Sequence, residues 1–273
     1  MKPGIPIAVS ALIGACGLAA AAFSERLKIT HYTVKSGKSA GRTRFLHISD
    51  LHSSDFGEEL YRAIDDICPD AVMMTGDIAD NRVPNENAFR LARYVGKCCP
   101  AFYVSGNHEI YTHDPDGIKN RLRGCGITVL EGEGAALDAG GNSFTVCGID
   151  DPYAFPDRNG RLWEDQLSDC ASLCRQDVFS ILLTHRPEMI RCYRETGFDL
   201  VLAGHAHGGQ VIIPGLVNGL YAPHQGFFPK YAGGKFDFPG QTMIVSRGLS
   251  KYVRPRVFNR PELVVIDIEA GKN

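Results

Sequence analysis

The sequence predicts an α/β domain of two packed sheets over residues 43–273. Three observations indicate this class: apolar runs of strand length recur along the chain, helical patterns separate the first of these runs, and no low-complexity linker interrupts the series. With 273 residues, of which 44% are hydrophobic, the chain can bury a sizeable core.

The elements follow one another in a regular order. Buried, largely parallel strands are expected first, at TRFLHIS (43–49), DAVMMTG (70–76), AFYVSG (101–106) and GITVL (126–130). Helical patterns such as ELYRAIDDIC lie between them, as in sheets whose strands are joined by crossover helices. The second half continues in this style, and its runs predict a more mixed sheet: NSFTVCGID, VFSILLTH, DLVLAGH, QTMIVSRG and PELVVIDIE.

The N-terminus differs from the rest of the chain. The stretch from Gly4 to Phe23 carries no charge and is just long enough to cross a hydrocarbon core as a helix. We therefore predict a membrane anchor over residues 1–25, followed by a linker over 26–42. Two alternatives stay open, namely a signal peptide cleaved near the alanines and a lipoprotein signal with lipidation at Cys16.

Charge and cysteine usage favour a cytoplasmic catalytic domain behind this anchor, although an extracytoplasmic one stays open. Eight cysteines follow the apolar stretch, and Cys98 and Cys99 are adjacent, which suits a disulfide framework poorly. Several cations follow the apolar stretch closely, as expected for the cytoplasmic side: Arg26, Lys28, Lys35 and Lys38.

The charge balance argues against a nucleic-acid-binding protein. The formal net charge is −2, and acidic and basic residues are interspersed. Because a polyanion-binding surface needs clustered cations, we predict no nucleic acid partner and expect function to reside in local groups of side chains.

Polar side chains of the metal-binding type follow the predicted strands. The carboxyl ends of parallel strands are where open α/β sheets gather their ligands. Two pairs are spaced i, i+2, which in extended backbone points both side chains to one face. Each residue alone is more often a turn or surface residue, but the ordered series indicates one cluster. Its members are Asp50, His52, Asp77, Asn107, His108, His185, His205 and His207.

These residues form motifs that resemble the signature of calcineurin-like metallophosphoesterases. The motifs occur in the same order over residues 43–210: Asp50-x-His52, Gly76-Asp77, Gly106-Asn107-His108-Glu109, His185 and Gly204-His205-x-His207. Three further segments resemble the bacterial membrane-anchored branch, which includes UDP-2,3-diacylglucosamine pyrophosphohydrolases: Gly208-Gly209-Gln210, Ser246-Arg247-Gly248 and Arg260-Pro261-Glu262. The resemblance implies a four-layer α/β/β/α sandwich with a dinuclear metal site.

The resemblance also implies a role for each residue. Asp50, His52 and His207 would hold one divalent metal ion. Asn107, His185 and His205 would hold the other, and Asp77 would bridge the two. Oxygen and imidazole ligands without thiolate suit Mn, Fe or Zn and do not choose between them.

The expected chemistry is an in-line displacement at phosphorus by a water that the metal pair activates. His108 is not needed as a ligand and is expected to donate to the phosphoryl or leaving oxygen, oriented by Asp80. Glycines surround His205 and His207, and we expect neither Gly204 nor Gly208 to tolerate a larger residue.

The expected substrate is a phosphodiester or pyrophosphate, in a lipid-linked molecule at the membrane. Residues 214–240 are rich in aromatics and interrupted by Gly and Pro, so we expect a long loop that starts near the metals. Most of its aromatics are expected to pack on the core, with Phe227 and Phe228 as contacts for a lipid. A nucleotide-type phosphodiesterase and an inactive metal-binding scaffold are the alternatives, and the oligomeric state stays open.

Overall fold

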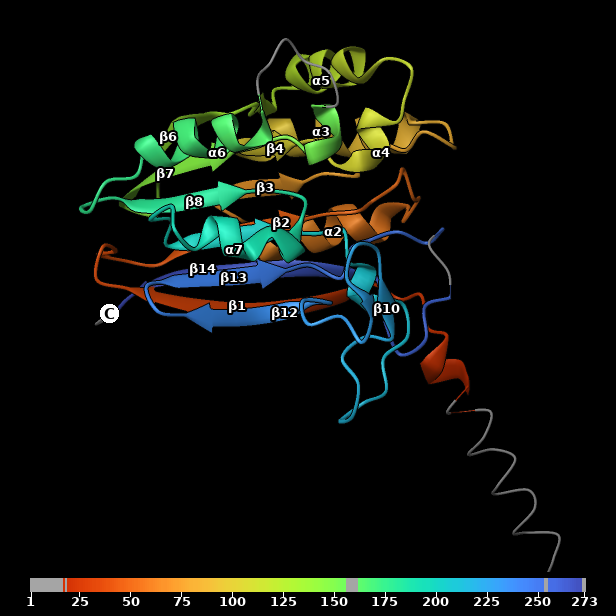
Figure 1. Cartoon of the computed structure of the whole chain (residues 1–273). Coiled ribbons are helices and arrows are strands. Elements are labelled where there is room, and N and C mark those ends of the chain that lie inside the picture. The colour runs from red at the N-terminus through yellow and green to blue at the C-terminus, as the bar shows by residue number, and fades with distance from the viewer. Residues whose placement is uncertain (1–16, 18, 156–161, 253–254, 272–273) are drawn as a thin grey trace, which may run out of the picture.

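The computed structural model describes residue 17 and residues 19–155, 162–252 and 255–271 (Figure 1). Two six-stranded sheets form the domain. The first has the order β1 (Lys28–Ser36), β14 (Glu262–Ala270), β2 (Thr43–Ile48), β3 (Ala71–Thr75), β4 (Ala101–Val104), β5 (Thr128–Val129). The second has the order β12 (Gly234–Phe238), β13 (Gln241–Val245), β9 (Leu200–Ala203), β8 (Phe179–Leu183), β7 (Asn142–Gly148), β6 (Glu133–Ala139).

Both sheets are mixed. In the first sheet β14 is antiparallel to β2, and the strands from β2 to β5 run parallel. In the second sheet the parallel strands β7, β8, β9 and β13 are flanked by antiparallel β6 and β12. The two mixed sheets of an α/β protein agree with the fold class that the sequence predicts.

Side-chain alternation along the strands divides the core into layers. On β2, Phe45 belongs to the cluster between the sheets, whereas Leu46 and Ile48 belong to the cluster under the helices. Phe45 meets Phe144 of the second sheet edge to face, with ring centroids 5.0 Å apart. Helices cover both outer faces (Figure 1), and the order of layers is therefore α/β/β/α: α2 (Glu58–Ile67), α3 (Glu86–Cys98) and α5 (Pro115–Gly124) on the first sheet, α6 (Trp163–Ser172) and α7 (Ile190–Tyr193) on the second.

Two segments differ from the sequence-based expectation. The expected linker over residues 26–42 contains β1, which pairs in parallel with β14 from Lys28 opposite Glu262 to Ser36 opposite Ala270. The expected loop over residues 214–240 contains β12 and a short hairpin of β10 (Tyr221–Ala222) and β11 (Gly226–Phe227). Both segments are stabilised by strands distant in sequence or by short hairpin contacts, which local composition does not reveal.

The predicted membrane anchor, and with it the membrane-anchored localisation, is corrected by the structure. In the described part of the chain, no helix has both the length and the apolar character that a membrane span requires. Most of the predicted span, residues 1–16 and 18, lies outside the described residues, as does Cys16. The described end of the stretch contacts the domain, because Phe258 donates its backbone N–H to the Ala22 carbonyl at 2.7 Å.

Candidate metal centre

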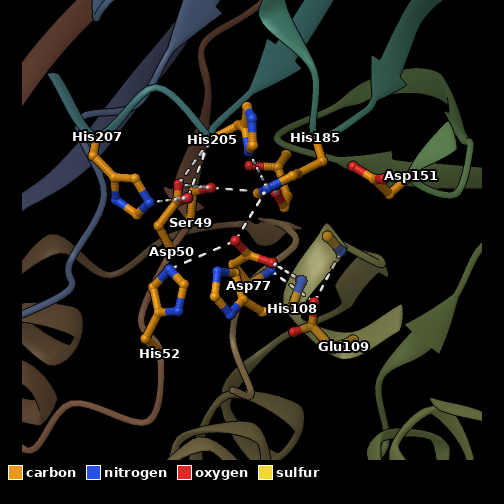
Figure 2. A network of polar contacts seen from close by, with 12 residues as sticks. Ser49, Asp50, His52, Asp77, His108, Glu109, Asp151, His185, His205 and His207 are labelled. Atoms are coloured by element: carbon orange, nitrogen blue, oxygen red, sulfur yellow. Dashed lines mark hydrogen bonds and ion pairs between the residues drawn. The ribbon is translucent and has the colours of Figure 1, made fainter. Parts of the chain in front are cut away.

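Loops at the carboxyl ends of strands from both sheets carry the seven predicted metal ligands. Figure 2 shows six of them close together: Asp50, His52, Asp77, His185, His205 and His207. Asp50 and His52 follow β2, Asp77 follows β3, and Asn107 opens the short helix α4 (Asn107–Ile110) after β4; His185 follows β8, and His205 and His207 follow β9. All seven are buried. Burial of so many polar side chains requires partners for their donor and acceptor atoms.

Ligand atoms converge in two groups that share Asp77. Asp50, His52, Asp77 and His207 form one group, and Asp77, His185 and His205 form the other, with ligand atoms within 4.8 Å of one another. The Asp77 Oδ2 atom lies 3.5 Å from His52 Nε2 and 3.2 Å from His185 Nε2, so one carboxylate oxygen faces both groups. The other oxygen, Oδ1, accepts the backbone N–H of His108 at 2.8 Å.

Four buried atoms of the predicted ligands have no hydrogen-bond partner among the described residues: His52 Nε2, Asp77 Oδ2, Asn107 Oδ1 and His207 Nδ1. An unpaired buried polar atom costs about 1–3 kcal/mol, and all four atoms are of the kinds that bind divalent cations. The donor set therefore fits two divalent cations, with Asn107 completing the group of His185 and His205.

The backbone at the ligands is left-handed. In the described chain eleven residues other than glycine have positive φ, and five of them are predicted ligands: Asp50 (50°), His52 (47°), Asp77 (51°), His205 (65°) and His207 (47°). Such residues cost on the order of 1–3 kcal/mol each and cluster at functional sites. The expectation of extended backbone for the two i, i+2 pairs is therefore wrong, although their side chains still reach one centre.

Close packing explains the glycines around the histidines. A Cβ atom at Gly204 would collide with the side chains of Ser49 and Asp50. At Gly208, where φ is +63°, a Cβ atom would collide with the side chain of Asn259. Both positions therefore require glycine, as the sequence predicts.

Burial keeps two of the predicted histidine ligands neutral, as cation binding requires. Burial, and then the neighbouring His185, holds the pKa of His205 well below its usual range, and burial followed by His52 does the same for His207. Burial would also lower the pKa of His185, but the Asp77 carboxylate outweighs it and raises this pKa to about 10. His185 donates from Nδ1 to the Thr75 carbonyl at 2.7 Å, so its Nε2 is the nitrogen that faces Asp77.

A second group of side chains holds the ligands in place. Asp80 Oδ2 lies 2.6 Å from His52 Nδ1, and 3.5 Å from His108 Nδ1. His108 Nδ1 is closer to Asn81 Oδ1, at 2.8 Å, and its ring packs edge to face on that of His52 with centroids 4.5 Å apart. His108 thus lies beside the centre, and its side chain is 18% exposed.

Glu109 ties the loops of this centre to one another. Its carboxylate accepts backbone N–H groups from Asp77, Ala79 and Gly106, each at 2.9 Å. Burial, with the Asp77 charge next, raises the pKa of Glu109 to about 7. The sequence motif contains this residue without revealing that its carboxylate caps three amides.

Sequence reasoning missed three residues on the other side of the centre. Arg186 pairs with Asp151 through two hydrogen bonds, and its Nη1 atom lies 3.0 Å from His205 Nε2 and 2.6 Å from His224 Nδ1. The signal for both is weak: Arg186 follows the predicted ligand His185, and Asp151 follows the predicted strand NSFTVCGID. His224 lies in a turn of the aromatic segment and has no sequence signal.

The aromatic side chains of residues 214–240 divide into two sets. Tyr231, Phe236 and Phe238 pack against the core cluster outside the second sheet. Phe227 and Phe228 are 72% and 67% exposed. The base of this segment adjoins the centre, because Leu220 donates its N–H to the carbonyl of Gly209, two residues after His207.

The fold and the centre together define a class, that of α/β/β/α phosphoesterases with buried Asp and His clusters. The model of the calcineurin-like phosphoesterase family matches residues 43–209, and the chain belongs to this family. A protein named uncharacterized metallophosphoesterase, from Aquifex aeolicus (strain VF5), is 30% identical over 261 residues, which cover 90% of this chain and 94% of that protein. Phosphodiesterase YaeI of Escherichia coli (strain K12) is 27% identical over 240 residues, which cover 84% and 83% of the two chains.

Solved structures agree on the fold. A crystal structure of phosphopantetheinyl hydrolase (PptH) from Mycobacterium tuberculosis superposes with a TM-score of 0.51 at 12% identity, covering 81% of this chain and 96% of that chain. At this identity the likeness concerns the fold alone. Family membership and the relatives' names identify the chain as a hydrolase of the metallophosphoesterase type.

Proposed function

We propose that this protein hydrolyses phosphodiester or pyrophosphate bonds with two divalent cations. The observation that carries the proposal is the position of Asp77 Oδ2, which has no hydrogen-bond partner in the described chain and faces one ligand group on each side. A pair of cations supplies Lewis-acid activation of water and charge stabilisation at the phosphoryl oxygens when bound. Asp50, His52 and His207 would hold one cation, Asn107, His185 and His205 the other, with Asp77 shared.

The chain's own side chains then provide orientation and a proton. His108 stands beside the shared carboxylate at the edge of the centre, and Asn81 accepts from its Nδ1, which leaves Nε2 for the substrate. We assign the donation of a hydrogen bond or proton to the phosphoryl or leaving oxygen to the protonated form of His108, in which Nε2 carries the second ring proton. The name of the relative YaeI supports a diester substrate over a monoester.

Metal exchange tests this proposal. The full chain is treated with a chelator, dialysed, and reloaded with Mn²⁺, Fe²⁺ or Zn²⁺ before assay with an aryl phosphodiester, an aryl monoester and a pyrophosphate. We expect chelation to abolish cleavage of the diester or the pyrophosphate, and we expect one of these ions to restore it. A folded chain that binds two cations and cleaves none of the three substrates would instead be a scaffold.

A lipid-linked substrate is favoured within this class by the exposed aromatic side chains. Phe227 and Phe228 expose large apolar surfaces, and Leu216 in the same segment is 79% exposed. Phe228 donates its backbone N–H to Leu220, whose own N–H binds Gly209, so the exposed rings are tied to the loop that carries His207. An acyl chain extending from a phosphoryl group at the centre would cover these side chains.

A further inference from the structure

His205 has a second ring nitrogen that faces away from the shared carboxylate. Its Nδ1 lies 3.1 Å from His185 Nε2, on the side of Asp77. Its Nε2 lies 2.9 Å from His224 Nδ1 and 3.0 Å from Arg186 Nη1. If Nδ1 holds a cation, Nε2 carries the ring proton and, because His205 is buried, that proton needs an acceptor.

Arg186 cannot be that acceptor. A guanidinium group has five donors and no lone pair available, and it stays charged in proteins. Its side chain is 3% exposed and is fixed on Asp151, with Nη2 to Oδ1 at 3.0 Å and Nε to Oδ2 at 2.5 Å. The Nη1 atom is thereby aimed at His224 and His205.

His224 Nδ1 can be the acceptor. Arg186 Nη1 only donates and lies 2.6 Å from this atom and 3.3 Å from His224 Nε2, so the nearer nitrogen, Nδ1, is the one without a proton, and its lone pair is shared by Arg186 Nη1 and His205 Nε2 in a three-centre contact. The proton of a neutral His224 ring is then on Nε2, which lies 3.1 Å from the hydroxyl of Tyr153. The rings of His205 and His224 are tilted by 33° with centroids 5.0 Å apart.

The same geometry argues against a third cation at this place. Glu188, His205 and His224 lie close enough together to hold an ion. However, Arg186 Nη1 is within 3.0 Å of both histidines and 3.5 Å from Glu188 Oε1, so a fixed positive charge already occupies the space between them. These groups are arranged around a guanidinium.

The backbone supports a functional position for His224. Its φ is 60°, the left-handed value also found at His205 and His207, although the residue lies on the surface in a turn. A strained conformation at an exposed residue other than glycine persists when neighbouring contacts determine it, and here these contacts lead to the centre.

We propose that His224 is a positioning residue for the cation held by His205. Its Nδ1 accepts the Nε2–H of His205 and thereby keeps the Nδ1 of His205 directed at Asp77 and His185. Arg186, fixed by Asp151, keeps His224 Nδ1 free of a proton and in place. The inference rests on the proposed dinuclear centre and adds a residue on which that centre depends.

The test counts the bound metal ions and measures their affinities, and neither readout depends on enzymatic turnover. The full chain and its variants are titrated with Mn²⁺, bound metal is counted by mass spectrometry, and spin coupling between two Mn²⁺ ions is followed by electron paramagnetic resonance. In His224→Ala, binding of one equivalent is expected to weaken by about 10- to 100-fold, as for other partners of metal-binding histidines, and the coupled signal is lost first. The other equivalent should keep its affinity.

Two variants separate positioning from general disruption. His224→Asn places an amide oxygen near the position of Nδ1, so it should restore binding of both equivalents to within a few-fold of the natural chain. Tyr153→Phe removes the contact at His224 Nε2 and leaves Nδ1 in place, so both equivalents should be retained. Two tightly bound equivalents in His224→Ala, or failure of His224→Asn to restore the lost one, would overturn the inference alone. A natural chain that binds fewer than two equivalents would overturn the proposed dinuclear centre and this inference with it.

Discussion

The His52 ring is held from behind by Asp80: Nδ1 of His52 lies 2.6 Å from Asp80 Oδ2, while Nε2 of the same ring faces Asp77 Oδ2 at 3.5 Å. Arg82 donates to the same Asp80 oxygen at 2.9 Å. A carboxylate behind a metal-binding histidine fixes which ring nitrogen carries the proton and makes the other a stronger ligand. The geometry thus gives Asp80 a closer partner in His52 than in His108.

Asp80→Asn is therefore expected to weaken the cation held by His52. The amide keeps the size of the side chain and removes its charge, and the affinity for one metal equivalent should fall by about 10- to 100-fold. Isothermal titration of the metal-depleted chain measures this affinity. Unchanged affinity together with a lower rate would show that Asp80 acts on His108 instead.

Asp77→Ala is expected to abolish binding of both cations. The variant removes the one oxygen that faces both ligand groups, so the group of His185 and His205 loses its charged donor and the other group keeps only Asp50. Metal content after dialysis is the measurement, and Asp177→Ala, which removes an exposed carboxylate that pairs with Arg175, is the matched control. Retention of one full equivalent would mean that Asp77 serves a single cation.

His108→Ala is expected to keep its metal and lose activity. The His108 side chain lies outside the two ligand groups around Asp77, so both cations should bind, while the rate with a diester should fall by roughly 10² to 10⁴, the range for a proton donor. Asn81→Ala, which removes the acceptor at Nδ1, should show a smaller fall. The exposed His113 provides the control variant His113→Ala. An empty metal centre in His108→Ala would make His108 a ligand.

The buried side chain of His47 is expected to make the free energy of unfolding depend on pH. Burial lowers the pKa of this β2 histidine from 6.5 to about 3. Between these values the unfolded chain binds one more proton at this residue than the folded chain does. Its contribution to the free energy of unfolding is therefore complete above pH 6.5 and is lost as the pH falls towards 3, by up to about 1.4 kcal/mol per pH unit. Urea unfolding of the natural chain and of His47→Gln between pH 4 and 7 measures the difference in slope. Equal slopes would contradict it.

The sequence predicts the strand ends well because each of these buried apolar runs is followed by a polar residue that the candidate metal centre uses. Asp50, Asp77 and His185 follow apolar runs whose lengths match β2, β3 and β8. The strand β1 was missed because its residues KITHYTVKS alternate between polar and apolar and are mostly exposed, so they lack the apolar run of a buried strand.

The environment of each ligand is harder to predict than the ligand itself. Asp80 is three residues from Asp77 and lies near both His52 and His108, so only distances decide which ring it holds. His224 reaches His205 through the folding of a turn, and no periodicity or spacing encodes that contact. Sequence patterns specify the residues that chemistry requires, whereas their orientation depends on packing between distant segments.

Replacing Phe227 and Phe228 together by Ser tests the lipid-linked substrate. Both rings are exposed, so the change should leave the stability of the fold nearly unaltered. If an acyl chain rests on these rings, kcat/KM for a lipid-linked pyrophosphate should fall by about tenfold or more, because covering a Phe side chain contributes roughly 1.5–3 kcal/mol. The value for a small water-soluble diester should stay the same, since that substrate reaches only the metal centre. Leu173→Ser, at an exposed leucine that follows α6, is the control for loss of apolar surface elsewhere. Equal effects on both substrates, or none on either, would remove the lipid from the proposal and favour a nucleotide-type diester in its place.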